Sequence, residues 1–222
     1  MLSCTTIRAE LSDRLDTVRN LLTSTHSAGG ATETEVAKVS RGLAIVLIYA
    51  SYEQLLVSLV RAILEVAAGL GVGNRRLRPG FQVFAAFPKL QATNAVTPAA
   101  IWSGRGLDVV SVINARNTCT IVASVFPDNG SHMKREQVRV LCDLFELGDP
   151  APVLREIWTR LNTIVDERNA VAHGRQTPDE VGRNYSLAEL QTLVDLWQQR
   201  WGEFLDLVEA LAATRDFYRV AR

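Results

Sequence analysis

Apolar residues recur every three or four positions along most of this chain, and this spacing predicts α-helices rather than β-strands. The first predicted helix, residues 7–24, places five aliphatic side chains on one side: Ile7, Leu11, Leu15, Val18 and Leu22. A longer apolar segment extends from residue 35 to about residue 70. It ends in a glycine-rich stretch that is typical of helix termination.

The C-terminal half carries further helical patterns with recognisable ends. Pro152 stands where proline is favoured, in the first turn of a helix, and Gly174 marks a plausible stop for that helix. Ser186 is a good N-cap, because Glu189 follows three residues later as in a capping box. We therefore expect three helices here, at residues 134–147, 152–173 and about 187–215.

The region between the two halves is harder to interpret. Residues 74–106 contain Pro79, Pro88 and Pro98, so we expect loops and short helical turns there. A helix over about 107–117 and a turn over 127–131 follow. The prediction is an all-α fold in a single domain, residues 1–222, built as a bundle of four to five main helices with an irregular insert at about 74–106.

Composition limits the possible functions. Of the 222 residues, 47% are hydrophobic, and 24 basic residues balance 24 acidic ones, so any nucleic-acid contact must come from a local basic cluster. Cys4, Cys119 and Cys142 are odd in number and far apart, which predicts neither a disulfide framework nor a thiolate metal site. With no signal-peptide pattern at residues 1–10, we expect a cytoplasmic protein without metal or cofactor.

One segment resembles a membrane span. Residues 42–72 are very apolar, but charged residues interrupt them, and the polar ones recur at three- and four-residue steps: Ser51, Gln54, Ser58, Arg61 and Glu65. A spanning helix needs roughly 20 residues with few or no charges. The pattern favours a helix that is buried on most sides of a protein core, and no membrane association is predicted.

Candidate chemistry is concentrated at residues 168–174. Seven residues are nearly two helical turns, so Arg168 shares the apolar face of Leu161 and belongs to the buried stripe. A buried guanidinium needs an anion or acceptors. Asn169 and His173, four residues apart, point the same way, whereas Arg168 and His173 are about 140° apart on a regular helix.

These residues also have purely structural interpretations. Arg168 could form an ion pair with Glu53 or Asp166, and His173 could simply complement a helix C-terminus. Glu53 lies at the border of the buried face of its own helix. It could pair with Arg168 for stability alone or support an active site.

The segment RNAVAHG, residues 168–174, matches the R-N-x-x-x-H pattern of the HEPN superfamily of helical RNases. Residues 49–56, YASYEQLL, resemble the tyrosine- and glutamate-bearing segment of HEPN domains in prokaryotic defence and toxin systems. The resemblance covers roughly residues 37–211, much of it by pattern only. In some members a tyrosine, modified by a partner nucleotidyltransferase, follows the histidine by two residues. Here that position is Arg175, which argues against this scheme.

The resemblance implies a metal-independent endoribonuclease whose cleft is shared by two copies of the chain. His173 would handle proton transfer at the 2′-hydroxyl or the leaving 5′-oxygen, and Arg168 would stabilise the scissile phosphate. Asn169 would orient His173 or hold a phosphate oxygen. The implied partners are RNA, a second copy of the chain and, for a toxin or antiviral effector, an antitoxin or other regulatory protein.

Further arginines are candidates for RNA binding. Arg175 and Arg183 follow the motif closely and are the better phosphate ligands. Two clusters are more typical of a solvated surface: Arg75, Arg76 and Arg78, and Lys134, Arg135 and Arg139. Two other functions remain open at this point: a non-catalytic HEPN-type module for dimerisation, scaffolding or regulation, and an unrelated helical adaptor. The combination of Arg168, Asn169 and His173 favours the RNase.

Overall fold

The computed structural model describes residues 1–26, 34–93, 96–116 and 133–220. This part of the chain is all-helical and contains no strand, only a single isolated bridge between Leu77 and Arg219. Four long helices make up the body: α1 (Thr5–Thr25), α2 (Glu35–Gly69), α7 (Ala151–Ala172) and α9 (Leu187–Ala212). The predicted all-α class is therefore confirmed. The turn expected at 127–131 lies outside the described residues.

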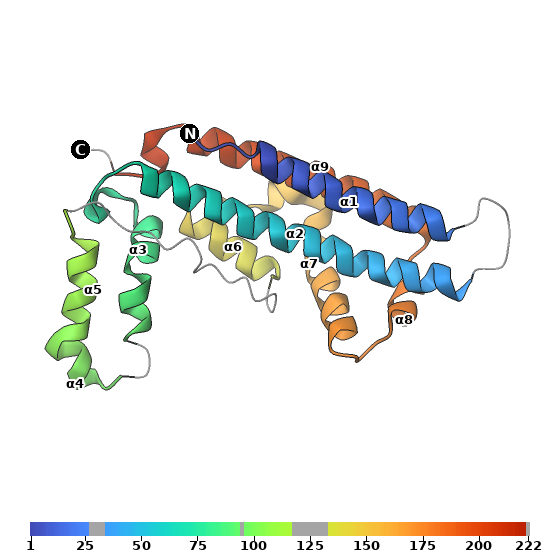
Figure 1. Ribbon diagram of the computed structural model, residues 1–222, viewed down its shortest axis with the longest axis horizontal. Coiled ribbons are helices and arrows are strands. Elements are labelled where there is room, and N and C mark those ends of the chain that lie inside the picture. Colours follow the sequence, from blue (N-terminus) through green and yellow to red (C-terminus); the bar gives the residue numbers. More distant parts are fainter. Residues whose placement is uncertain (27–33, 94–95, 117–132, 221–222) are drawn as a thin grey trace.

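The long helices α1, α2 and α9 lie side by side along the long axis of the molecule (Figure 1). The aliphatic stripe predicted for α1 is buried against its neighbours. Ion pairs stabilise the outer side of this contact, because Arg8 binds Asp206 at 2.6 Å and Arg19 binds Asp195 at 2.8 Å, both on α9. Helix α9 begins as predicted, with Ser186 and Glu189 exchanging capping hydrogen bonds.

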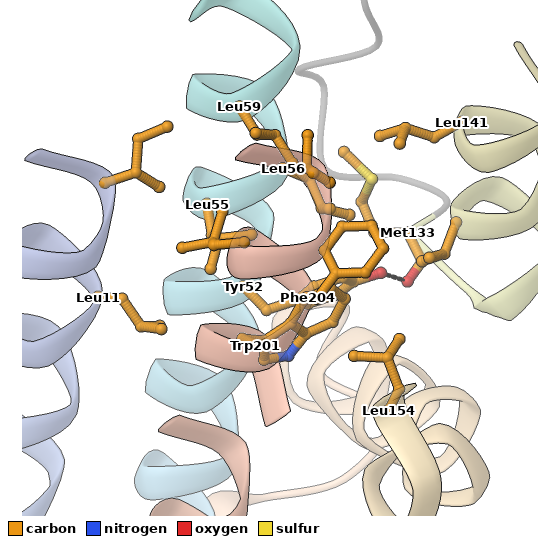
Figure 2. Packing of buried hydrophobic residues seen from close by; sticks show 14 of the residues in the cluster. Leu11, Tyr52, Leu55, Leu56, Leu59, Met133, Leu141, Leu154, Trp201 and Phe204 are labelled. Atoms are coloured by element: carbon orange, nitrogen blue, oxygen red, sulfur yellow. Dashed lines mark hydrogen bonds between the residues drawn. The ribbon is translucent and has the colours of Figure 1, made fainter. Parts of the chain in front are cut away.

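Aromatic side chains fill the centre of the bundle. Tyr52 of α2 stacks on Trp201 of α9 with 5.2 Å between ring centroids and meets Trp197 edge to face at 5.9 Å. Figure 2 shows Tyr52 between these helices, with its hydroxyl donating a hydrogen bond to the carbonyl of Met133. This bond connects the segment before α6 (Arg135–Leu144) to the core. The ring contacts of Tyr52 thus hold α2 against α9, and its hydroxyl holds the start of α6 against the same core.

The expectation of loops and short helical turns at 74–106 is correct only in part, because residues 79–91 form a full helix. The chain forms a helix, α3 (Pro79–Gln91), and then the short α4 (Pro98–Ala100), a π-helical turn (Ile101–Arg105) and α5 (Gly106–Ile113). Together they make a hairpin that projects from one end of the bundle (Figure 1). The prolines do not prevent this, because Pro79 and Pro98 begin helices and Pro88 lies exposed in the last turn of α3.

Helix α2 is long and apolar enough to cross a membrane by length and composition alone. In this fold it is the central core helix, because 17 of its residues are buried against the rest of the chain. Polar side chains interrupt its apolar surface. Glu53 and Gln54 are half-buried at the side of the helix. Core burial explains its apolar composition, as predicted.

The short helix α8 (Pro178–Gly182) packs against the start of α2 without any side chain between the two backbones. A Cβ on Gly182 would lie 1.9 Å from the carbonyl oxygen of Lys38, and one on Gly42 would lie 1.8 Å from that of Pro178. Arg41, which is 4% exposed, donates from Nε to the carbonyl oxygen of Gly182 at 2.9 Å. This contact fixes the position of the chain that follows His173.

Gly182→Ala should therefore move α8 away from α2 and destabilise the protein by about 1–3 kcal/mol, because backbone atoms cannot yield to a methyl group. Thermal unfolding measures this as a drop in Tm of roughly 2–4 °C for each kcal/mol. Gly69→Ala is the matched control. A Cβ there meets nothing within 4 Å, so alanine should leave Tm unchanged or raise it slightly. Equal Tm values for both variants would contradict the close packing of α8 on α2.

Candidate functional site

Helix α7 ends at the residues that carry the candidate chemistry. His173 is the C-cap, and Gly174 follows with a φ of 65°, a conformation that glycine adopts without strain. The N–H of Gly174 donates to the carbonyl of Val171, and that of Arg175 to the carbonyl of Ala170. These two bonds form a Schellman motif, which satisfies the last carbonyls of the helix. The predicted stop at Gly174 is confirmed.

Arg168 lies at the end of the buried stripe of α7, as its spacing from Leu161 predicted, and its side chain is half-buried. Its guanidinium lies over the ring of Tyr49 of α2, with 4.5 Å between Cζ and the ring centroid. Nη1 also donates to Oδ1 of Asn169 at 2.9 Å. The cation is therefore held by an aromatic face and an amide oxygen at the surface of the core.

Tyr49 connects Arg168 to the core of the bundle. Its side chain is 1% exposed, and its ring meets Tyr52 edge to face at 5.9 Å. Its hydroxyl donates to Oε1 of Glu53 at 3.1 Å. Burial raises the pKa of Tyr49 far above its ordinary value, and the neighbouring charge of Glu53 adds to this increase. The hydroxyl therefore stays protonated at physiological pH.

Asn169 is bonded to both other members of the motif. Its side-chain oxygen accepts from Arg168, and its backbone carbonyl accepts the N–H of His173 at 3.0 Å. Its carboxamide nitrogen remains able to donate to a phosphate or to an imidazole. The imidazole of His173 is on an exposed residue at the end of the helix, open to an incoming ligand. The side chains of Arg168 and Asn169 are thus bonded to each other, while His173 follows at the end of the same helix, connected to Asn169 through the backbone.

The other predicted residues differ in the contacts that they make. Glu53 contributes through the hydroxyl of Tyr49. Asp166, the alternative partner considered for Arg168, binds Lys134 at 2.7 Å.

The two arginines predicted to bind RNA differ in their ion pairs. Arg183 is bound by Asp179 at 2.7 Å and lies 4.0 Å from Glu35, so its charge is already balanced. Arg175 is exposed and, within the described part of the chain, has no carboxylate at ion-pair distance, which makes it the better phosphate ligand.

Sequence reasoning did not assign a role to Tyr49. It stood inside the segment YASYEQLL that carried the family resemblance, four residues before Glu53 and so on the same side of α2. That spacing was the available signal. Its pairing with a cation 119 positions further along the chain became evident only from the packing of α7 on α2.

A cavity of about 380 Å³ opens between α7 and α9, on a different face of α7 from Asn169. Its walls include Arg160, Tyr185 and Leu193. Beside it the hydroxyl of Tyr185 donates to Oε2 of Glu167 at 2.6 Å. Burial raises the pKa of this half-buried carboxyl, although the hydrogen bonds from Tyr185 and Asn184 act in the opposite direction.

Comparison with known proteins adds no assignment, since no protein-family model, curated protein or solved structure matches this chain. Within the described residues, no group of three or more His, Cys, Asp or Glu side chains is placed to hold a metal ion.

Tyr185→Phe should destabilise the protein by about 1–3 kcal/mol, because it removes a hydrogen bond from a half-buried carboxylate. The raised pKa of folded Glu167 means that its contribution to stability is fully present below the unfolded value of about 4.3. That contribution is lost as the pH rises through the folded pKa. The variant removes an interaction that lowers this pKa, so the loss of stability should be larger at pH 8 than at pH 5.

Urea unfolding of wild type and variant at both pH values measures this difference. Tyr218→Phe is the control, because the buried hydroxyl of Tyr218 has no hydrogen-bond partner among the described residues. Its removal should cost little at either pH. A Tyr185→Phe loss of the same size at pH 5 and pH 8 would show that Glu167 is not the group concerned.

Proposed function

We propose that this chain is a HEPN-like, metal-independent endoribonuclease whose active site contains Arg168, Asn169 and His173. The observation that carries the proposal is the support of the Arg168 guanidinium on Tyr49, five residues before an exposed His173 at the end of the same helix. A cation held on a rigid aromatic face costs little reorganisation when it meets a phosphate. The resemblance of residues 168–174 to the R-N-x-x-x-H pattern supplies the reaction class.

The proposed reaction is attack of the RNA 2′-hydroxyl on the adjacent phosphorus. The 2′-oxygen loses its proton to a neutral imidazole and forms a P–O bond, while the bond from phosphorus to the 5′-oxygen breaks and that oxygen takes a proton. The products are a 2′,3′-cyclic phosphate and a 5′-hydroxyl. Arg168 stabilises the charge on the non-bridging oxygens, and the carboxamide of Asn169 orients His173 or holds one of these oxygens.

We further propose that two copies of the chain share the cleft. Arg168 and His173 are five residues apart on α7, so within one copy they face different directions by about 140°. An exposed apolar stripe lies in the first turns of α2 and is formed by Val36, Val39 and Leu43. A stripe of this kind is typical of a helix that packs against a partner. A second copy there would supply a second His173 for the other proton transfer.

A toxin or antiviral-defence role follows from the same resemblance, with a cytoplasmic location and a regulatory protein or antitoxin as the expected partner. The alternative is a non-catalytic module of the same type, used for dimerisation, scaffolding or regulation. One contact favours this alternative: Arg168 already satisfies Oδ1 of Asn169, as it would in a purely structural arrangement. Activity measurements separate the two functions.

Purified wild type, incubated with total RNA in EDTA, should produce fragments with 2′,3′-cyclic phosphate and 5′-hydroxyl ends. His173→Ala should lose at least about a hundredfold in rate, the usual contribution of a general acid or base. Ligation-based mapping of the fragment ends measures both the position and the chemistry of cleavage.

Gln176→Ala is the matched control, because Gln176 is exposed and lies only three residues beyond His173. This variant should cleave RNA at the wild-type rate. Sedimentation confirms that all three proteins are folded and in the same oligomeric state. The endoribonuclease proposal fails if His173→Ala cleaves as fast as wild type. It also fails if EDTA abolishes cleavage.

A further inference from the structure

A second group of arginines lies at the end of the bundle where α2 terminates. The 3₁₀ turn Asn74–Arg76 follows this end directly, and the amide of Arg75 donates to the carbonyl of Ala115, beyond α5, at 3.4 Å. A Cβ on Gly73 would lie 2.5 Å from the carbonyl oxygen of Arg116, so the two backbones touch. The exposed residues Arg75 and Arg116 are therefore neighbours.

The C-terminal segment brings further arginines to the same place. Leu77 forms a backbone bridge with Arg219, and the amide of Val220 donates to the carbonyl of Arg76 at 3.0 Å. Arg215 lies one turn before Arg219, in the 3₁₀ turn Arg215–Phe217. Three segments that are distant in sequence thus contribute to one arginine cluster: Arg75, Arg76, Arg116, Arg215 and Arg219.

The charge of this arginine cluster is not balanced internally. Within the described part of the chain, none of its five guanidinium groups has a carboxylate at ion-pair distance, whereas the adjacent Arg78 is bound by Glu146. The same three segments contain one acidic residue, Asp216. In a chain with a net charge of zero, this is a local concentration of positive charge.

Arginine rather than lysine at every position favours phosphate as the ligand, because the planar guanidinium binds phosphate oxygens through two parallel hydrogen bonds. The groups are spread over a surface formed by three segments. A surface of this kind fits a chain of phosphates rather than a single one.

We propose that the arginine cluster binds the phosphate backbone of single-stranded RNA at a distance from the cleavage site. The choice of RNA rests on the proposed function. Along α2, Tyr49 and the helix end at Gly69 are about 30 Å apart, from 1.5 Å per residue. At a phosphate spacing of about 3.4 Å or more, up to roughly nine nucleotides separate the two sites. The cluster therefore acts on long RNA and not on a tetranucleotide.

Fluorescence anisotropy with a labelled 20-nucleotide 2′-O-methyl oligouridine tests this directly, because this RNA cannot be cut by attack of a 2′-hydroxyl. The double variant Arg75→Gln/Arg116→Gln should weaken binding about tenfold at 100 mM salt. It should reduce the salt slope by about 1.4, for two lost contacts at roughly 0.7 each. Both side chains are exposed, so Tm should be unchanged. Arg219→Gln, at a different segment, should weaken binding in the same direction.

The control is Arg14→Gln/Arg160→Gln, which removes the same charge from exposed positions outside the cluster and should change the Kd by less than about twofold. Equal weakening by both double variants would overturn the proposal, since it would reflect net charge alone. So would binding that the cluster variant leaves unchanged, or a preference of wild type for anionic lipid vesicles over RNA.

Cleavage separates this inference from the proposed function. Arg75→Gln/Arg116→Gln should cut a tetranucleotide at the wild-type rate and long RNA more slowly. If wild type binds the oligouridine through the cluster but cuts no RNA, the inference stands and the RNase proposal fails. If wild type cuts RNA and binding is insensitive to the cluster, the RNase proposal stands and this inference fails.

Discussion

The contact between Arg168 and Tyr49 is the interaction on which the candidate site depends. It places a cation at the end of an apolar stripe, where an aliphatic residue would pack more simply. Tyr49 is in turn fixed by Tyr52, whose ring stacks on Trp201 in the centre of the bundle. The position of the guanidinium is therefore determined by the core of the protein and not by a surface loop.

The segment that follows residues 168–174 is also fixed by close packing. Glycines on both helices let α8 pack backbone to backbone against α2, and the buried Arg41 closes this contact. The turn that carries His173 is thus fixed at both ends, by α7 before it and by α8 after it. A backbone positioned in this way fits the role in proton transfer that is proposed for His173.

Helical periodicity was sufficient to predict the fold class and the long helices. The capping residues Ser186 and Glu189 even fixed the start of α9. Helix α3 was missed because proline was interpreted as a helix breaker, although Pro79 begins this helix and Pro88 lies in its last turn. Helix α5 was expected at about 107–117 and is found at Gly106–Ile113. The sequence pattern singled out Arg168, Asn169 and His173 as candidate site residues. It could not reveal that Tyr49 supports Arg168, because that contact exists only after α2 and α7 have packed together.

The most direct test of this account is to measure unfolding and RNA cleavage together for Arg168→Met. Two of the groups that hold Arg168, the ring of Tyr49 and the amide oxygen of Asn169, are uncharged, so an apolar side chain of similar length leaves no unpaired charge on either of them. If Arg168 is present for catalysis, the variant should lose less than about 1 kcal/mol of stability and lose cleavage by at least about a hundredfold. A variant that is destabilised by about 3 kcal/mol or more, while its folded fraction cleaves at the wild-type rate, would show that Arg168 is structural.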